Sequence, residues 1–158
     1  MFRKMRRARQ ELSKEECEKI LLENKTGVLG VIGDGGYPYT VPLNFVYESG
    51  KIYFHCAKTG HKLDAIKNDP KVSFCVVDKD DVVKEKLTTY FKSVIVFGRA
   101  RELTDDEEIY EAAEKLGLKY SDDLEYIKEE IERERKILSC VEISVEHMSG
   151  KQAKELMK

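Results

Sequence analysis

The clearest chemical signal lies in residues 53–63, which read Tyr-Phe-His-Cys-Ala-Lys-Thr-Gly-His-Lys-Leu. The pattern predicts a strand, a short loop with a glycine, and a helix that carries His61 and Lys62 in its first turn. Free backbone N–H groups at a helix N-terminus bind anions, and a neighbouring lysine adds positive charge. We therefore interpret this helix start as a candidate phosphate site. The chain has neither GxxxxGK[ST] nor GxGxxG, which excludes a P-loop and a dinucleotide fingerprint.

Histidine is the second candidate for chemistry. His55 lies at the end of the predicted strand, on the face opposite Phe54 and Cys56, and could serve as acid, base or ligand near neutral pH. The alternative is a structural hydrogen bond. His147 alternates with Val145 on the apolar face of the last predicted strand, so we expect a structural role. With three histidines and no carboxylates clustered near them, we expect no metal site.

Pro42 stands in the middle of an alternating apolar segment, residues 38–47. Proline cannot donate to a β ladder, so its position predicts an edge strand or a bulge. Open backbone beside Leu43 and Asn44 could hydrogen-bond a flat heteroaromatic ligand. An edge that is merely protected against aggregation is an equally good explanation.

The four cysteines are far apart in the sequence and form no CxxC pair, so neither a zinc site nor a disulfide framework is expected. Each lies in an apolar context and is interpreted as a small core residue. They are Cys17, Cys56, Cys75 and Cys140.

These candidates must be positioned by a fold that is mainly β (α+β). Period-2 patterns and turn signals predict six strands, at about residues 27–32, 38–47, 51–56, 71–78, 90–103 and 139–147. Helices are predicted at about 13–24, 61–68, up to 116 and 122–136, the last two divided by Gly117. Hairpins without βαβ periodicity favour one six-stranded antiparallel barrel with peripheral helices, as a single domain of residues 1–158.

Composition bounds the function further. A net charge of −2 carries no nucleic-acid footprint, although residues 1–10 form a basic segment and the helical insertion, residues 104–136, is acidic. No apolar run could span a bilayer, and the basic start is followed by no apolar stretch of a secretory signal. We therefore expect a cytoplasmic protein with no membrane or nucleic-acid partner, whose basic segment dangles or packs on a partner subunit.

The ordered set of segments resembles the FMN-binding split-barrel family, whose best-known member is pyridoxamine 5′-phosphate oxidase. The resemblance is carried by residues 27–77, by 90–100 and by the closing residues 147–151. It covers about residues 11–151 and is closest to the branch of nitroimidazole-resistance (Nim-like) flavoproteins. It implies a split barrel that forms a homodimer, with FMN in a groove between the subunits.

The resemblance also implies roles for individual residues. It places Gly60, His61 and Lys62 at the FMN phosphate, and it brings Ser93 toward the flavin from the fifth strand. His55 would stand beside the reactive centre of the flavin and the substrate. The remaining implied contacts are with the flavin ring for Val41, Pro42, Leu43 and Asn44, and with the ribityl chain and flavin for Cys56, Ala57 and Lys58.

Two departures argue against oxidation of vitamin B6. The oxidase itself uses an arginine on the second strand for the phosphate, but no arginine occurs between Arg9 and Arg99. It also has an arginine-rich C-terminal substrate segment, whereas this chain ends Ala-Lys-Glu-Leu-Met-Lys. We therefore expect an FMN-dependent oxidoreductase, nitroaromatic reductase-like, that moves two electrons between the flavin and a small-molecule donor or acceptor. The alternatives are a flavin storage or redox-sensing module without turnover, a split barrel that binds haem or a deazaflavin, and a cofactor-free assembly domain.

Overall fold

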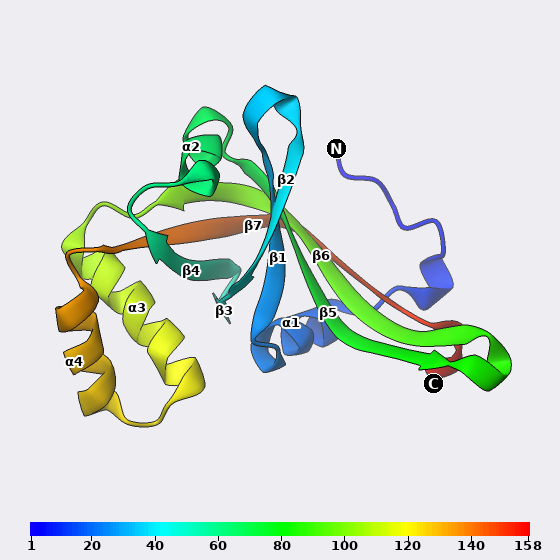
Figure 1. Ribbon diagram of the computed structural model, residues 1–158. Helices are drawn as coiled ribbons and strands as arrows, with labels where there is room; N and C mark the ends of the chain where they lie inside the picture. The colour runs from blue at the N-terminus through cyan, green and yellow to red at the C-terminus, as the bar shows by residue number, and fades with distance from the viewer.

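The computed structural model describes residues 1–158, which form a seven-stranded antiparallel sheet with four α-helices around it (Figure 1). The strands follow one another across the sheet in the order β2-β1-β5-β6-β7-β4-β3. Their bounds are β1 Thr26–Ile32, β2 Pro38–Asn44, β3 Val46–Glu48, β4 Lys51–Ala57, β5 Lys71–Val83, β6 Thr88–Glu102 and β7 Leu138–Gln152. The helices are α1 Lys14–Glu23, α2 His61–Asn68, α3 Asp106–Tyr120 and α4 Leu124–Glu134.

The antiparallel, mainly β architecture was predicted correctly, but the count of six strands was wrong. The segment 38–47 alternates as expected, yet it is divided at Phe45 into β2 and β3. The division is forced because β2 pairs only with β1, at one edge of the sheet, while β3 pairs only with β4, at the other. The backbone of Phe45 carries the chain from one edge to the other, and its side chain is fully buried. The two edges are joined by the chain and not by a ladder, so the sheet stays open.

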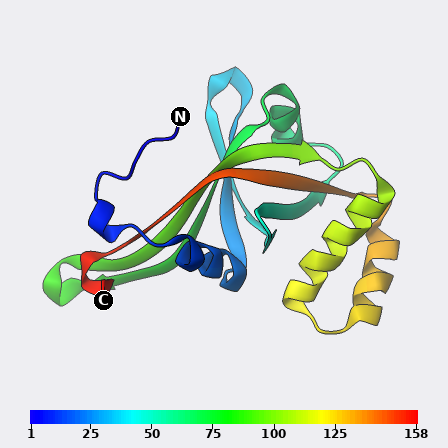
Figure 2. The same cartoon turned by 180° about the vertical axis from the view of Figure 1, so that it is seen from behind.

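Two apolar clusters hold the elements together. The larger one fills the inner face of the curled sheet, where Phe45, Phe54 and Phe74 are fully buried and residues of α1 and α2 complete the packing. The smaller one lies on the outer face of β4 and β7, where Tyr53 and Cys140 are covered by α3 and α4. Figure 2 shows this helix pair at one side of the sheet, away from the long β5–β6 hairpin. No helix is both long enough and apolar enough to cross a lipid bilayer.

The β5–β6 hairpin is longer than the sequence indicated. Pairing continues past the expected strand end to Val83 and Thr88, across a register shift between Val77 and Lys79. The predicted polar loop therefore shrinks to a short turn, in which Leu87 adopts a left-handed conformation.

A bulge changes the direction of His147. Alternation places this side chain on the face of Val145, and that prediction was wrong. The β6–β7 register shifts so that Val145 faces Gly98 while His147 faces Phe97, which leaves Glu146 as the extra residue. Val145 packs against the core, whereas His147 lies beside the exposed ring of Phe97 on the outer face.

The crossing at Phe45 is stabilised by the end of α3. The Lys119 ammonium donates to the carbonyls of Asn24 and Phe45, the latter at 2.8 Å, and lies 3.9 Å from the centre of the Phe45 ring. The Tyr120 hydroxyl donates to the carbonyls of Lys25 and Phe45, each at 3.4 Å. The acidic insertion thus supplies donors to three backbone carbonyls at the crossing, of which that of Lys25 also accepts from the backbone N–H of Phe45 at 3.2 Å.

We predict that Lys119→Met destabilises the protein by about 1–3 kcal/mol, because part-buried carbonyls lose a charged donor while the aliphatic packing is kept. Urea unfolding followed by circular dichroism measures the change. Lys128→Met, on the exposed side of α4, is the matched control and should leave the midpoint in place. Equal urea midpoints for Lys119→Met and Lys128→Met would contradict the stabilisation of the Phe45 crossing by Lys119.

Gly117 does not divide the helices, as the sequence had indicated, because α3 continues to Tyr120. Its role is close packing: a Cβ atom there would lie 2.6 Å from Cγ2 of Ile127, which is buried in α4. Glycine thus lets two helices approach where any side chain would push them apart.

Gly117→Ala is expected to destabilise the protein by about 1–3 kcal/mol through overpacking, despite the better helix propensity of alanine. The cost should shrink in an Ile127→Ala background, where the opposing methyl groups are gone. A double-mutant cycle from urea unfolding measures this coupling. If the changes in free energy of unfolding are additive, the contact between residues 117 and 127 does not cause the destabilisation.

Candidate functional site

The start of α2 has the features of an anion site. Its N-cap is Gly60, which has a φ of 149° and no side-chain cap, and a Cβ atom there would meet nothing within 4 Å. The other three helices each begin with a capping side chain, from Ser13, Asp105 and Asp123. The first N–H groups of α2 therefore have no capping side chain as acceptor, and the space beside Gly60 is open to an anion.

Lysine 62 supplies the charge at this helix start. Within α2, His61 lies 3.7 Å from a carboxylate oxygen of Asp34 and Lys67 pairs with Glu102 at 3.4 Å, whereas Lys62 pairs with no acid. The half-buried Lys62 is close enough to Cys56 to influence the thiol electrostatically. Lys62 thus remains available to an incoming anion.

The His61 ring is held by the chain itself. Its Nε2 accepts a hydrogen bond from the backbone N–H of Asp34 at 3.0 Å, and its ring lies 4.2 Å from that of Tyr39. An Nε2 that accepts from an N–H belongs to a neutral imidazole with its proton on Nδ1. The side chain therefore anchors α2 to the β1–β2 turn, while its backbone N–H belongs to the open helix start. Sequence reasoning missed this contact, because nothing in the local pattern links residues 34 and 61.

Strand β2 lies at the sheet edge, as Pro42 predicted. Val41 and Leu43 turn inward and pack against the core, while Pro42 and Asn44 are exposed. The Tyr39–His61 contact connects this strand directly with the start of α2. The contact is made near the start of β2, and residues 41–44 follow further along the same strand.

The end of β4 lies at the opposite edge. Because β3 pairs only with Lys51–Tyr53, residues 54–57 of β4 pair with β7 on one side alone. His55 and Ala57 are exposed, Cys56 packs against the core, and the exposed Lys58 leads toward Gly60. This strand end therefore continues directly into the candidate phosphate site.

Desolvation by surrounding protein atoms shifts the pKa values of the ionisable groups here. Protein atoms around the His55 ring desolvate it and lower its pKa, so the imidazole is neutral at pH 7. Burial raises the pKa of the Cys56 thiol, which rules out a thiolate at neutral pH. The buried Cys17 and Cys140 have pKa values raised to about 11 and about 12, in line with their interpretation as core residues.

Ser93 lies apart from the other candidates. It sits on β6, opposite Val77 of β5 and Lys151 of β7. Two strands separate β6 from β2, and β7 separates it from β4. A single chain therefore does not bring Ser93 to the proposed phosphate site.

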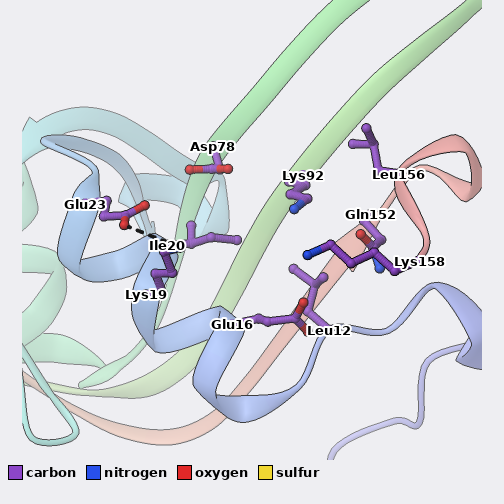
Figure 3. Close-up of a pocket in the computed structure, with 10 residues that line it drawn as sticks. All are labelled: Leu12, Glu16, Lys19, Ile20, Glu23, Asp78, Lys92, Gln152, Leu156 and Lys158. Atoms are coloured by element: carbon purple, nitrogen blue, oxygen red, sulfur yellow. Dashed lines mark ion pairs between the residues drawn. The ribbon is translucent and has the colours of Figure 1, made fainter.

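A cavity of about 390 Å³ lies elsewhere, between α1, β5, β6 and the C-terminal turn (Figure 3). Glu16, Lys19, Glu23, Asp78, Lys92 and Lys158 line it, together with Leu12, Ile20, Gln152 and Leu156. Several of these groups already have partners: Glu16 completes the α1 capping box, Lys19 pairs with Glu23 at 3.8 Å, and Asp78 accepts from Asn24. The cavity shares no residue with the candidate site.

Comparison with known proteins places this geometry in context. The family described as pyridoxamine 5′-phosphate oxidase matches residues 13–152. A candidate 5-nitroimidazole antibiotic resistance protein from Bacteroides thetaiotaomicron is 21% identical, with a TM-score of 0.74 over 89% of this chain and 85% of that one. A conserved hypothetical protein from Mycobacterium tuberculosis is 19% identical, with a TM-score of 0.80 over 97% and 92%.

A FAD-binding protein from Mesorhizobium loti is 28% identical, with a TM-score of 0.64 over 91% of this chain and 97% of that one. No curated protein matches the chain. The comparisons agree with the fold built here from the sheet order and the edge strands.

The desolvation of His55 predicts its titration. We expect its ring to titrate below about 6.5, the value for a solvated histidine, in an NMR titration of the ring Hε1 signals. Because the unfolded chain binds the proton more readily than the folded one, acidification below pH 6.5 should also cost stability, and His55→Gln should reduce that cost. A midpoint at or above that of the urea-unfolded protein would contradict the desolvation.

Proposed function

This chain belongs to the pyridoxamine 5′-phosphate oxidase family, and we propose that it is a flavoprotein oxidoreductase that binds FMN. Two electrons would move between the flavin and a small molecule, in the manner of nitroaromatic reductases. The observation that carries the proposal is the uncapped start of α2, with the unpaired Lys62 beside it and the edge strand β2 nearby.

The residues present fit a phosphorylated flavin. The open space at Gly60 admits a phosphate, which Lys62 and the first N–H groups of α2 would hold. The His61 ring would stay on Asp34 and keep the helix start in place. Bound FMN would supply the two-electron chemistry.

The strand segments would position the ring system. Residues 41–44 of β2 offer an exposed sheet edge, in which Pro42 has no N–H of its own, to a flat heteroaromatic group. Residues 55–58 would lie along the ribityl chain. The neutral imidazole of His55 would donate or accept one hydrogen bond and orient the acceptor molecule.

A second copy of the chain would complete this site. In one chain the edges that carry residues 41–44 and 55–58 are open, and Ser93 lies apart. The outer face also carries a row of cross-strand partners with exposed or half-exposed apolar side chains, Pro42, Val28, Cys75 and Ile95. We propose this row as the homodimer contact, through which Ser93 of the second copy would reach the flavin.

Absorbance spectra test the cofactor. We expect flavin bands that stay with the protein after FMN is added and the excess is removed. A Soret band in the purified protein would identify haem, and not a flavin, as the cofactor. Preferential retention of FAD would identify FAD in place of FMN. A protein that retains no chromophore, even in excess FMN, would refute the proposed function.

Lysine 62 offers the sharper test. We expect Lys62→Ala to weaken FMN binding roughly tenfold to a hundredfold, the loss of one charge-assisted contact. Quenching of FMN fluorescence measures the affinity, and riboflavin, which lacks the phosphate, should bind both proteins equally. Lys67→Ala, five residues further along α2, is the control. Wild-type FMN affinity in Lys62→Ala would overturn the phosphate assignment.

Turnover separates an enzyme from a flavin store. Bound FMN that is reduced by NADH or NADPH and then reoxidised by a nitroaromatic compound would support the oxidoreductase. Bound FMN that undergoes neither reaction would point to storage or sensing.

A further inference from the structure

A second cleft lies on the outer face of the sheet, under residues 1 and 2. Its volume is about 640 Å³, within the size range of small-molecule sites. Met1 and Phe2 form one wall, and residues of β1, β2, β5 and β6 form the floor. The proposed flavin strand borders it, because Pro38 and Thr40 of β2 belong to the lining.

Four members of a row of five cross-strand partners line this cleft, and the fifth, His147, lies outside its lining. Thr40 lies opposite Gly30, Gly30 opposite Ser73, Ser73 opposite Phe97, and Phe97 opposite His147. The first three are small and leave a shallow trough, and the last two are rings. The bulge at Glu146 is what turns His147 outward to join Phe97 in this row.

The two rings are nearly parallel and together form the platform on which Phe2 is stacked. Their centroids are 6.3 Å apart, and their planes differ by 16°. The ring of Phe2 is stacked on both, 4.7 Å from His147 with a 10° angle between planes and 5.6 Å from Phe97 with a 7° angle. Parallel stacking at these distances is how a planar aromatic ligand binds to aromatic side chains.

Phe2 is a loosely tethered occupant of this platform. Residues 10–12 are fastened to β7, where Gln10 donates to the Gln152 carbonyl at 2.8 Å and Leu12 to the Gly150 carbonyl at 2.9 Å. From Met1 to Arg9 the chain is exposed apart from the half-buried Met5. The stack is therefore the main attachment of the first residues, and a ligand of the same shape would compete with it.

The charges around the cleft favour a neutral ligand. Lys71 and Arg99 are balanced by Asp69 and Glu146, and Arg99 pairs with Glu146 at 3.1 Å. No unpartnered cluster of one sign marks the lining, in contrast to the start of α2.

We propose that a flat, neutral aromatic molecule of about two or three fused rings displaces Phe2 from the wall of this cleft and stacks on Phe97 and His147 at the edge of the cleft. The site is distinct from the phosphate-binding start of α2 and does not depend on the proposed flavin. The proposed dimer contact runs along the neighbouring row, so a second copy would wall the cleft on that side.

Titration of the full chain with 2-naphthol, a neutral bicyclic probe, tests the site. The chain has three histidines, so their ring NMR signals can be resolved, and His147 is identified by loss of its signal in His147→Asn. We expect the probe to shift the His147 signal. A shift of the His55 or His61 signals alone, or of none, would overturn the proposal.

Variants then test the competition by Phe2. The chain has eight tyrosines and no tryptophan, so naphthol is excited at a wavelength that tyrosine does not absorb, and its fluorescence anisotropy then reports binding without protein emission. Phe2→Ala should tighten probe binding roughly threefold to tenfold, the factor that corresponds to one aromatic stack. Phe97→Leu should weaken it by a similar factor, and Tyr126→Ala, on the exposed side of α4, should leave it unchanged. Equal affinities of Phe2→Ala and wild type would show that Phe2 does not occupy the site.

Discussion

The passage of the backbone through Phe45 is the constraint on which the architecture depends. One residue connects the two outermost strands of a seven-stranded sheet, so the edges come close at one point and diverge from it. The Phe45 ring is buried against Phe74, with centroids 5.0 Å apart, and fixes the depth of the crossing. The open edges of β2 and β4 follow from this connection, and these edges carry most of the candidate site.

Helix α2 performs two tasks that compete for its first turn. Its buried face, with Leu63 and Ile66, fills the inner core, which fixes the helix axis. An N-terminal cap would add stability, but it would also fill the space at Gly60. The fold fastens the helix start through the His61 ring instead, on the β1–β2 turn, and leaves the backbone N–H groups exposed. The His61 side chain thereby fastens the helix, while the backbone of the same turn stays uncapped.

Local patterns predicted most of the elements, because alternation and turn residues act over a few positions. They identified the edge strand from Pro42 and the helix start at residue 61. They did not predict the break at Phe45 or the bulge at Glu146, because both arise from pairing with distant strands. Side chains of the last strand alternate between the two faces of the sheet up to the bulge. There one extra residue reverses the alternation, so that His147 lies on the outer face.

The candidate site was predictable only as separate pieces. The spacing of residues 55–62 revealed a strand end and a helix start, but the neutral tautomer of His61 depends on Asp34, which lies 27 positions away. Desolvation by surrounding protein atoms, and not any nearby charge, lowers the pKa of His55, although the side chain is partly open to solvent, and those atoms are brought there by the complete sheet. Gly117 read as a helix breaker because glycine serves both chain reversal and close helix packing. Only the position of α4 distinguishes the two uses.

The contacts of Lys119 with the Phe45 crossing also bear on the order in which parts of the fold form. Lys119 is 95 residues from Asn24 and 74 from Phe45 in the sequence, so these bonds close long loops and form only after the intervening chain has been arranged. On a ribosome, the residues of β1 to β4 emerge before residue 119, and until then the carbonyls of Asn24 and Phe45 lack the Lys119 donor. The Lys119 contacts at the crossing therefore form late, because they require α3 to be in place.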